Sequence, residues 1–237
     1  MSNSDTPPIT ITGANGTDGK YPGSKGADRG QASAGTNGTA YADKNGNWHC
    51  CTNPGNGLTG DSGGQGNVGQ NGGNGLDSPP TTLKITTVTG RLDILIGGGN
   101  GGNGTKGGQG GNGGNGGNAG SIVAVNNCTD KTPTSGSPSG CCTAASQGAA
   151  GAGGRGGKGG AGGNGGNSGT VNIYYHEIQS GASLNPQHAY GFAGKGGAGG
   201  DPGTPGTGVG GGGNLGGGEI GADGINGKAG QVNLYQF

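Results

Sequence analysis

The sequence predicts an irregular repeat fold: a bundle of polyglycine II (polyproline II-type) helices with short β-strands in an accompanying sheet and essentially no α-helix. Three observations predict it. Glycine supplies 71 of the 237 residues, it recurs at every third position through most of the chain, and each main glycine run ends in a short apolar stretch. A period of three residues is the repeat of the polyproline II helix, not that of an α-helix or a β-strand.

The glycine phase is clearest between Gly148 and Gly169, where every third residue is glycine without a break. A second glycine row runs beside it from Gly153 to Gly165, so that only the third row carries side chains. Because glycine has no Cβ, a neighbouring backbone can approach such a row closely. We therefore expect double-glycine runs to lie inside the bundle and single-glycine runs to lie outside.

Apolar residues are too few for a conventional core. Hydrophobic residues make up 25% of the chain and aromatic residues 4%, whereas an average domain is roughly 45–50% apolar. A disordered glycine linker is the alternative, but such linkers do not keep a strict period over a long run. We expect one elongated ordered domain over residues 1–237, with disulfide-rich loops at about 40–56 and 126–147.

Several short runs rich in β-branched residues predict strands. They are residues 8–12, 83–89 and 91–96, and the ends of the three main glycine runs at 121–125, 170–174 and 231–235. The main runs cover 97–120, 148–169 and 191–230, and weaker runs cover 13–38 and 57–75. Thr89 and Gly90 predict the turn of a hairpin between two of these strands.

The charge pattern excludes some partners. The 12 basic and 12 acidic residues give a net charge of zero, and the basic residues are scattered rather than clustered. Nucleic-acid binding needs a basic patch, so we do not expect it. No apolar run approaches the about 18 residues that span a membrane. The first residues also lack the basic and apolar regions of a secretory signal, so the export route is not visible.

The five cysteines lie outside the glycine runs and are disulfide candidates: Cys50, Cys51, Cys128, Cys141 and Cys142. Their spacing lacks the C-x2-C pattern of zinc sites. Disulfides would stabilise a chain with so small a core and would place it in an oxidising compartment. Reduced thiols in an intracellular protein are the alternative. The odd number leaves one thiol free or paired between chains, and the pairing stays open.

No motif points to catalysis, a cofactor or a metal. His49 lies beside Cys50 and Cys51, but no ligand spacing fits, so a disulfide-rich loop with a nearby histidine is the favoured interpretation. His176 and Glu177 end a predicted strand, where an exposed strand face is favoured over an acid–base pair. We therefore expect a protein that is not an enzyme.

Two other sets of residues are candidates for function. The third row of the glycine runs predicts a solvent-facing ladder of Asn103, Lys106, Gln109, Asn112, Asn115, Asn118, Arg155, Lys158, Asn164 and Asn167. Strands at both termini predict pairing with another subunit's sheet edge. The assembly-strand candidates are Ile9, Ile11, Val232, Leu234, Tyr235 and Phe237.

The stretch Gly151-Ala-Gly-Gly-Arg-Gly-Gly-Lys-Gly-Gly-Ala-Gly-Gly-Asn-Gly-Gly166 resembles proteins built from bundled polyglycine II helices. These are the springtail antifreeze proteins and the receptor-binding adhesins at phage tail-fibre tips, and mycobacterial surface proteins are similar in composition. The resemblance covers about 60% of the chain by its periodic runs. The antifreeze proteins lack the strand that closes each repeat here, and the adhesins carry a fibre-attachment domain that is not found here. No functional residue is carried over.

These observations favour a structural function. The expected protein is a subunit of an extracellular filament, sheath or surface layer, which associates with its own copies through strand pairing. One alternative is an adhesin that binds a surface glycan or receptor through loops at the end of the bundle. The other is an ice-binding protein, which the charged and amide-rich third row disfavours.

Overall fold

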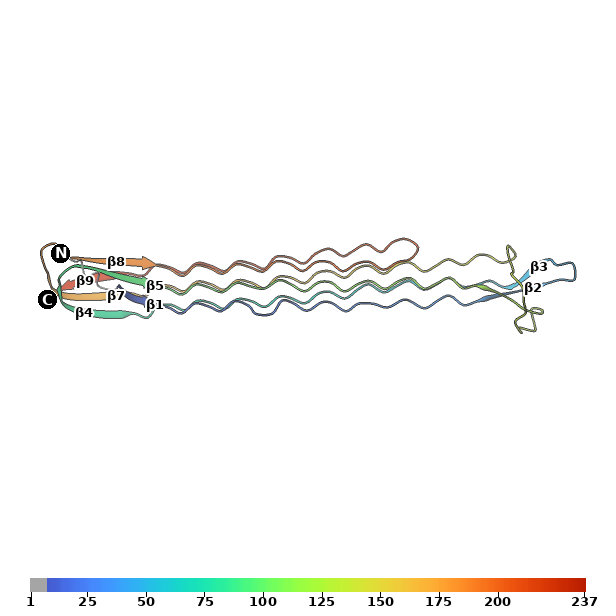
Figure 1. The fold of residues 1–237 in the computed structure, drawn as a ribbon, viewed down its shortest axis with the longest axis horizontal. Coiled ribbons are helices and arrows are strands. Elements are labelled where there is room, and N and C mark those ends of the chain that lie inside the picture. Colours follow the sequence, from blue (N-terminus) through green and yellow to red (C-terminus); the bar gives the residue numbers. More distant parts are fainter. Residues whose placement is uncertain (1–7) are drawn as a thin grey trace.

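The computed structural model describes residues 8–237 as a long, narrow rod with strands at both ends (Figure 1). The nine strands are β1 (Ile9–Thr12), β2 (Gly38–Ala42), β3 (Trp48–Thr52), β4 (Thr81–Val88), β5 (Arg91–Gly97), β6 (Ile122–Ala124), β7 (Val171–Ile178), β8 (Ser183–Ala189) and β9 (Val232–Gln236). Two three-stranded sheets form one end, which we call the sandwich end, and a third forms the other, the tip. The part between them is the shaft.

Six extended glycine-rich segments build the shaft. In chain order, the first to the sixth segment are residues 13–37, 53–80, 98–121, 143–170, 190–208 and 217–231. The first, third and fifth segments leave the sandwich end in one layer, and the second, fourth and sixth return in another. The fifth and sixth segments reverse before the tip, so only four segments reach it (Figure 1).

Backbone hydrogen bonds in the shaft join different segments and recur at every third residue. Within a layer, the N–H of Gly16 donates to the carbonyl of Asn100 at 2.7 Å. Between layers, the N–H of Gly157 donates to Gly108 at 2.7 Å, and its carbonyl accepts from Gly200 at 2.7 Å. Because buried backbone groups need partners, this network satisfies segments that form no hydrogen bonds of their own.

The third and fourth segments lie at the centre of the shaft, and each is hydrogen-bonded to four neighbouring segments. These two segments carry the double-glycine rows, whereas the first and sixth segments, with one main glycine row, lie at the outside. This confirms the prediction that double-glycine runs lie inside the bundle and single-glycine runs outside. The reason is close approach of backbones. A Cβ at Gly157 would overlap the carbonyl oxygen of Asn67, and glycine is the residue that avoids this clash.

At the sandwich end, a first sheet (β1-β5-β8) faces a second sheet (β4-β7-β9), and strands within each sheet are parallel. The core between them is formed by Ile94 and Ile96 of β5 with Val171 and Ile173 of β7, all fully buried. Half-buried residues surround it: Ile9, Ile11, Leu83, Ile85, Leu92, Leu184 and Val232. The largest fully buried apolar side chains of the described residues are thus concentrated in this core.

The predicted fold class is wrong. The described residues contain no helix, and their regular structure consists of strands in three small sheets, so a bundle of helices with one accompanying sheet does not describe them. The physical reason is that the N–H groups of the period-three runs bond to neighbouring segments and never along their own segment. The apolar stretches then form sheets only at the two ends, where they meet.

The predicted strands and turns agree with the structure in part. The hairpin at Thr89 and Gly90 does not form, because β4 and β5 belong to different sheets and the turn crosses between the two layers. The main run 191–230 is interrupted at 209–216, where the chain reverses. The predicted strands at both termini and after the glycine runs are present as β1, β4 to β7 and β9. Strands β2, β3 and β8 were not expected.

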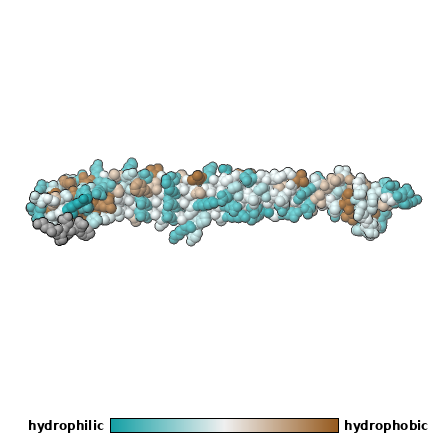
Figure 2. All heavy atoms as spheres, turned by 45° about the horizontal axis from the view of Figure 1, so that its top comes forward, coloured by the Kyte–Doolittle hydropathy of each residue, from teal (hydrophilic) through white to brown (hydrophobic). Residues whose placement is uncertain are grey.

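The tip consists of a sheet in the order β3-β2-β6 and the loop 126–142 beside it. Strand β2 pairs with β3 in the antiparallel sense and with β6 in the parallel sense. On the face shown in Figure 2, brown hydrophobic residues gather near the two ends, and the shaft is mainly pale or teal. On this face, hydrophobic surface is therefore found mainly near the two ends.

Candidate functional site

The predicted solvent ladder lies on the two outer faces of the shaft. Its members on the third segment are exposed apart from the half-buried Asn112, and those on the fourth segment are exposed. Their oxygens, however, are largely engaged. The Oδ1 atoms of Asn103, Asn115 and Asn164 accept backbone N–H groups of the next segment at 2.8, 2.9 and 2.9 Å. These side chains therefore hold neighbouring segments together.

Most of the remaining ladder side chains also bind a neighbouring segment. Asn112 and Asn167 accept the backbone N–H groups of Thr204 and Lys228 at 3.2 and 2.8 Å, and Asn118 accepts the side chain of Gln31 at 3.3 Å. The charged members are paired across segments: Lys106 with Asp201, and Arg155 and Lys158 with Glu219. Gln109 differs: its backbone carbonyl accepts the N–H of Gly26 at 2.8 Å, and its side chain makes no hydrogen bond within the described residues. Most ladder side chains therefore link neighbouring segments of the shaft.

The cysteines tie the tip together. Cys50 is bonded to Cys142 and Cys51 to Cys128, so the vicinal pair in β3 anchors both ends of the loop 126–142. Cys141 is free and half-buried. The sequence left this pairing open, since five cysteines at these spacings allow many arrangements. The disulfides are compatible with an extracellular protein.

A tight turn between β2 and β3 forms the far end of the tip. Asp43 accepts the backbone N–H groups of Asn45 and Asn47 at 2.9 Å each, and His49 Nε2 lies 3.2 Å from its second oxygen. The backbone bond from Asn47 and the side-chain bond from His49 lower the pKa of Asp43 to about 2. His49 also stacks on Tyr41 at 5.2 Å. This histidine therefore contacts the turn, and the neighbouring Cys50 and Cys51 are both in disulfides rather than free thiols.

The assembly-strand candidates divide into two groups. Ile9, Ile11 and Val232 pack against the core between the two sheets. Leu234, Tyr235 and Phe237 are exposed by 49%, 43% and 63%. The first group is therefore part of the apolar core of the sandwich end. The second group is exposed on the edge strand β9 and at the residue that follows it.

An aromatic row crosses the outer face of the second sheet. Tyr174 of β7 stacks on Tyr235 of β9 with ring centroids 4.8 Å apart, and Lys84 of β4 lies in the same register. Beside the row, Thr82, Lys84, Tyr174 and Phe237 line a hollow of about 400 Å³. Sequence reasoning missed this arrangement, because the register that aligns Lys84, Tyr174 and Tyr235 comes from strands distant in sequence.

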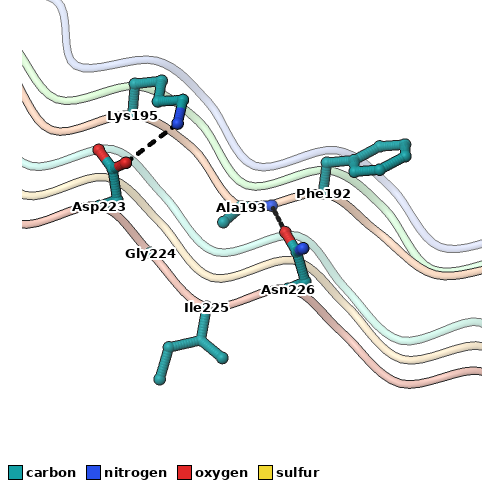
Figure 3. Close-up of a pocket in the computed structure, with 7 residues that line it drawn as sticks. All are labelled: Phe192, Ala193, Lys195, Asp223, Gly224, Ile225 and Asn226. Carbon is teal, nitrogen blue, oxygen red and sulfur yellow. Dashed lines mark hydrogen bonds and ion pairs between the residues drawn. The ribbon is translucent and has the colours of Figure 1, made fainter.

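A second hollow, of about 700 Å³, lies along the fifth and sixth segments (Figure 3). Its polar groups bind one another: Lys195 pairs with Asp223 at 3.0 Å, and the backbone N–H of Ala193 donates to Asn226 at 2.8 Å. Figure 3 shows the side chains of Phe192 and Ile225, which also line it, pointing in opposite directions. No set of side chains converges there to hold a ligand.

Residues 8–237 contain no group of three or more His, Cys, Asp or Glu side chains that could hold a metal ion. Within the same residues, no helix has the length and apolar character needed to cross a membrane. The features that remain are the strand edges of the sandwich end and the disulfide-linked tip.

Comparison with known proteins gives the chain no family. No family model matches it, and no curated protein matches it. A solved springtail antifreeze protein from Granisotoma rainieri, described as a nine polyproline type II helical bundle whose crystal waters match the ice lattice, is similar at 24% identity. The match covers 93% of this chain and 94% of that chain with a TM-score of 0.10. At that score the likeness carries no argument about fold or function.

Proposed function

We propose that this protein is a non-enzymatic structural subunit of an extracellular filament, sheath or surface layer, in which rigid rods associate through strand pairing. One observation carries the proposal: the rod ends in two small parallel sheets, and the outer edge of each edge strand is unpaired within the described residues. Unpaired strand edges are templates for pairing with another chain.

The shaft supports a structural role because its shape is fixed along its whole length. Backbone hydrogen bonds at every third residue connect each segment to its neighbours, in both layers and between them. Amide side chains and ion pairs add further links on the outer faces. A body cross-linked this densely transmits force and keeps a fixed spacing between its two ends.

The placement of the edges favours an open assembly. The first and second segments are hydrogen-bonded neighbours, so β1 and β4 lie on one side of the sandwich, and β8 and β9 lie on the other by the same argument. Contact between the two different sides is a heterologous contact, which repeats without closing on itself when related by translation. Rods would then lie side by side with their tips pointing the same way.

Electron microscopy and sedimentation velocity of the oxidised 237-residue chain over a range of concentrations test the proposal. We expect side-by-side arrays of rods that grow with concentration. Single rods at every concentration would overturn the proposal. Reduced protein is the matched control, because the sandwich end contains no disulfide and its edges should still pair.

One observation favours an adhesin as the second candidate. Two disulfides and the Asp43 turn hold the tip loops in a defined shape at the end of the rod that is remote from the sandwich. Such loops could bind a surface glycan or receptor. Substituting the exposed Lys44 and Asn45 should then abolish binding to target cells without affecting array formation, whereas array-deficient variants should still bind.

A further inference from the structure

The two edges of the second sheet are complementary to each other. In this sheet β4 and β9 occupy opposite edges, and both run parallel to the central strand β7. A strand β4 from another copy can therefore continue the sheet beyond β9 in the same direction.

The hydrogen-bonding groups at the β9 edge point outward at alternate residues. The N–H of Phe237 donates to the carbonyl of Tyr175, and the carbonyl of Gln231 accepts the N–H of Val171. Since successive residues of a strand direct their backbone groups to opposite sides, the groups of Val232, Leu234 and Gln236 face the free edge. No strand lies beyond them in the described chain.

The outer edge of β4 presents the matching set. The N–H of Thr81 donates to the carbonyl of Thr170, so Thr81 faces β7 and the next residue faces away. The same alternation turns the backbone groups of Thr82, Lys84 and Thr86 to the outer edge. Three positions on each edge therefore have groups available for pairing, with the same spacing.

The edges of the first sheet are less suited to pairing. Strand β8 carries Pro186, which has no N–H, at a position whose backbone faces the free edge, because the N–H of Ser183 bonds to Gly90 on the other side. Strand β1 has only four residues. Proline and short length are the usual means of protecting a sheet edge. Strand β9 has five residues and no proline, and β4 on the opposite edge has eight residues.

We propose that β9 binds β4 of a second copy in the register Val232 with Thr81, Leu234 with Leu83, and Gln236 with Ile85. This rests on the proposed function and specifies its contact. The register follows from the sheet itself, in which Leu83 lies opposite Ile173 and Ile173 opposite Leu234. Adding Leu83 of the second copy extends this apolar row and covers Leu234, which is 49% exposed.

The outer face gives a second contact in the same register. Tyr174 covers one face of the Tyr235 ring at 4.8 Å and leaves the other toward the free edge. In the proposed register, Lys84 of the second copy lies next to that open face. A lysine ammonium over a tyrosine ring is an attractive arrangement, so both faces of the sheet favour the same alignment.

Cysteine cross-linking tests the register. In a Cys141→Ser background, Asn233→Cys and Thr82→Cys lie opposite each other only across two copies, because β7 separates β9 from β4 within one chain. Two strand spacings are about 9.6 Å, beyond the about 7 Å limit for Cα atoms of a disulfide. We expect a ladder of covalent oligomers from this pair. The control pair Asn233→Cys with Thr86→Cys is four residues out of register and should give at most a tenth of that yield.

A second variant keeps the test independent of cross-linking yield. Leu234→Pro removes an N–H that faces the free edge and leaves the bonds to β7 intact, so the monomer should fold with unchanged circular dichroism and lose its arrays. Arrays that form without the 233–82 cross-link, or that survive Leu234→Pro, would overturn the inference while the proposed function stands. Absence of arrays in the unmodified chain would overturn both.

Discussion

The sandwich end and the shaft belong to one chain but are held together by different interactions. The sandwich end buries four aliphatic side chains completely, whereas the shaft has glycine backbones in contact and almost no apolar side chains inside. A chain with 25% hydrophobic residues can therefore fold with one small aliphatic core at the sandwich end and with hydrogen-bonded backbone in the shaft.

The comparison also shows how the two regions depend on each other. The register of β1 on β5 places Thr12 opposite Gly97, and the first shaft bond follows directly from the N–H of Gly13 to the carbonyl of Gly97. Likewise, β5 pairs Gly97 with Ala189, and the bond from Gly101 to Phe192 continues that alignment. The small apolar core sets the phase of the shaft, because side-chain packing fixes register where glycine alone would let segments slide.

The largest loss of stability is expected from a substitution that disrupts the shaft. Gly157→Ala places a Cβ against the carbonyl of Asn67 at the centre of the hydrogen-bond network. Neighbouring segments must separate, and several bonds are lost together, so we expect the free energy of unfolding to fall by more than about 4 kcal/mol, in the range diagnostic of a structural clash. Urea unfolding followed by circular dichroism measures this.

The matched control is Gly30→Ala, because nothing lies within 4 Å of a Cβ built there. The same chemical change should be neutral or raise stability by about 0.4–1 kcal/mol through the unfolded chain. Equal effects at the two glycines would show that glycine serves the shaft by flexibility rather than by close approach.

A smaller effect is expected in the sandwich end. Ile173→Ala removes a fully buried side chain from the core and should cost about 3 kcal/mol, within the usual range for such truncations. Because the core sets the register, hydrogen exchange should increase in the shaft segments next to β7 as well as in the sheets. If amide protection were lost only in the sheets, the core would not set the register of the shaft.

Part of this architecture was predictable from the sequence. The period of three and the double-glycine rows identify the inner segments, because only residues without a Cβ allow such close backbones. The β-branched residues near Ile9, Val171 and Val232 identify strands. The number of sheets was not predictable, since it depends on which layer each strand enters. The hairpin at Thr89 and Gly90 failed for that reason: a short turn fits a crossing between layers as well as a pairing within one.

The candidate site was less predictable. Residues such as Leu234 and Tyr235 could be named from their position in a terminal strand, but their exposure at a sheet edge depends on pairing with β7. Pro186, which distinguishes the edges of the two sheets, lies in a stretch without a strand pattern. The disulfide pairing required the fold as well, because vicinal cysteines at Cys50 and Cys51 have several possible partners.

Loss of one polar contact in the shaft should destabilise the protein less than either Gly157→Ala or Ile173→Ala. Asn164→Ala removes the acceptor of the Ile225 N–H, a bond of 2.9 Å at an exposed position. A net cost of about 1 kcal/mol is expected for one hydrogen bond. Asn164→Asp keeps an acceptor and should retain most of the stability, so thermal unfolding of the two variants separates loss of the bond from loss of the side chain.

The smallest effect is expected at the tip, from protonation of Asp43. The backbone bonds of the shaft and the aliphatic core do not titrate, but the Asp43 turn does. The backbone bond from Asn47 and the side-chain bond from His49 lower the pKa of Asp43 to about 2, against about 3.9 for a free aspartate. With the folded pKa depressed, this contribution to stability is present above about pH 4 and is lost as the pH falls toward 2.

Amide chemical shifts of Asn45 and Asn47 should therefore titrate with a midpoint near pH 2. Shaft amides that donate to a backbone carbonyl, such as that of Gly157, should stay unchanged through the same range. Asp43→Asn is the matched control, because it keeps an acceptor oxygen but has no charge to lose, and its amide shifts should not move. A midpoint near pH 4 in the unmodified chain would contradict the expectation. It would mean that the hydrogen bonds of the turn do not stabilise the carboxylate form of Asp43.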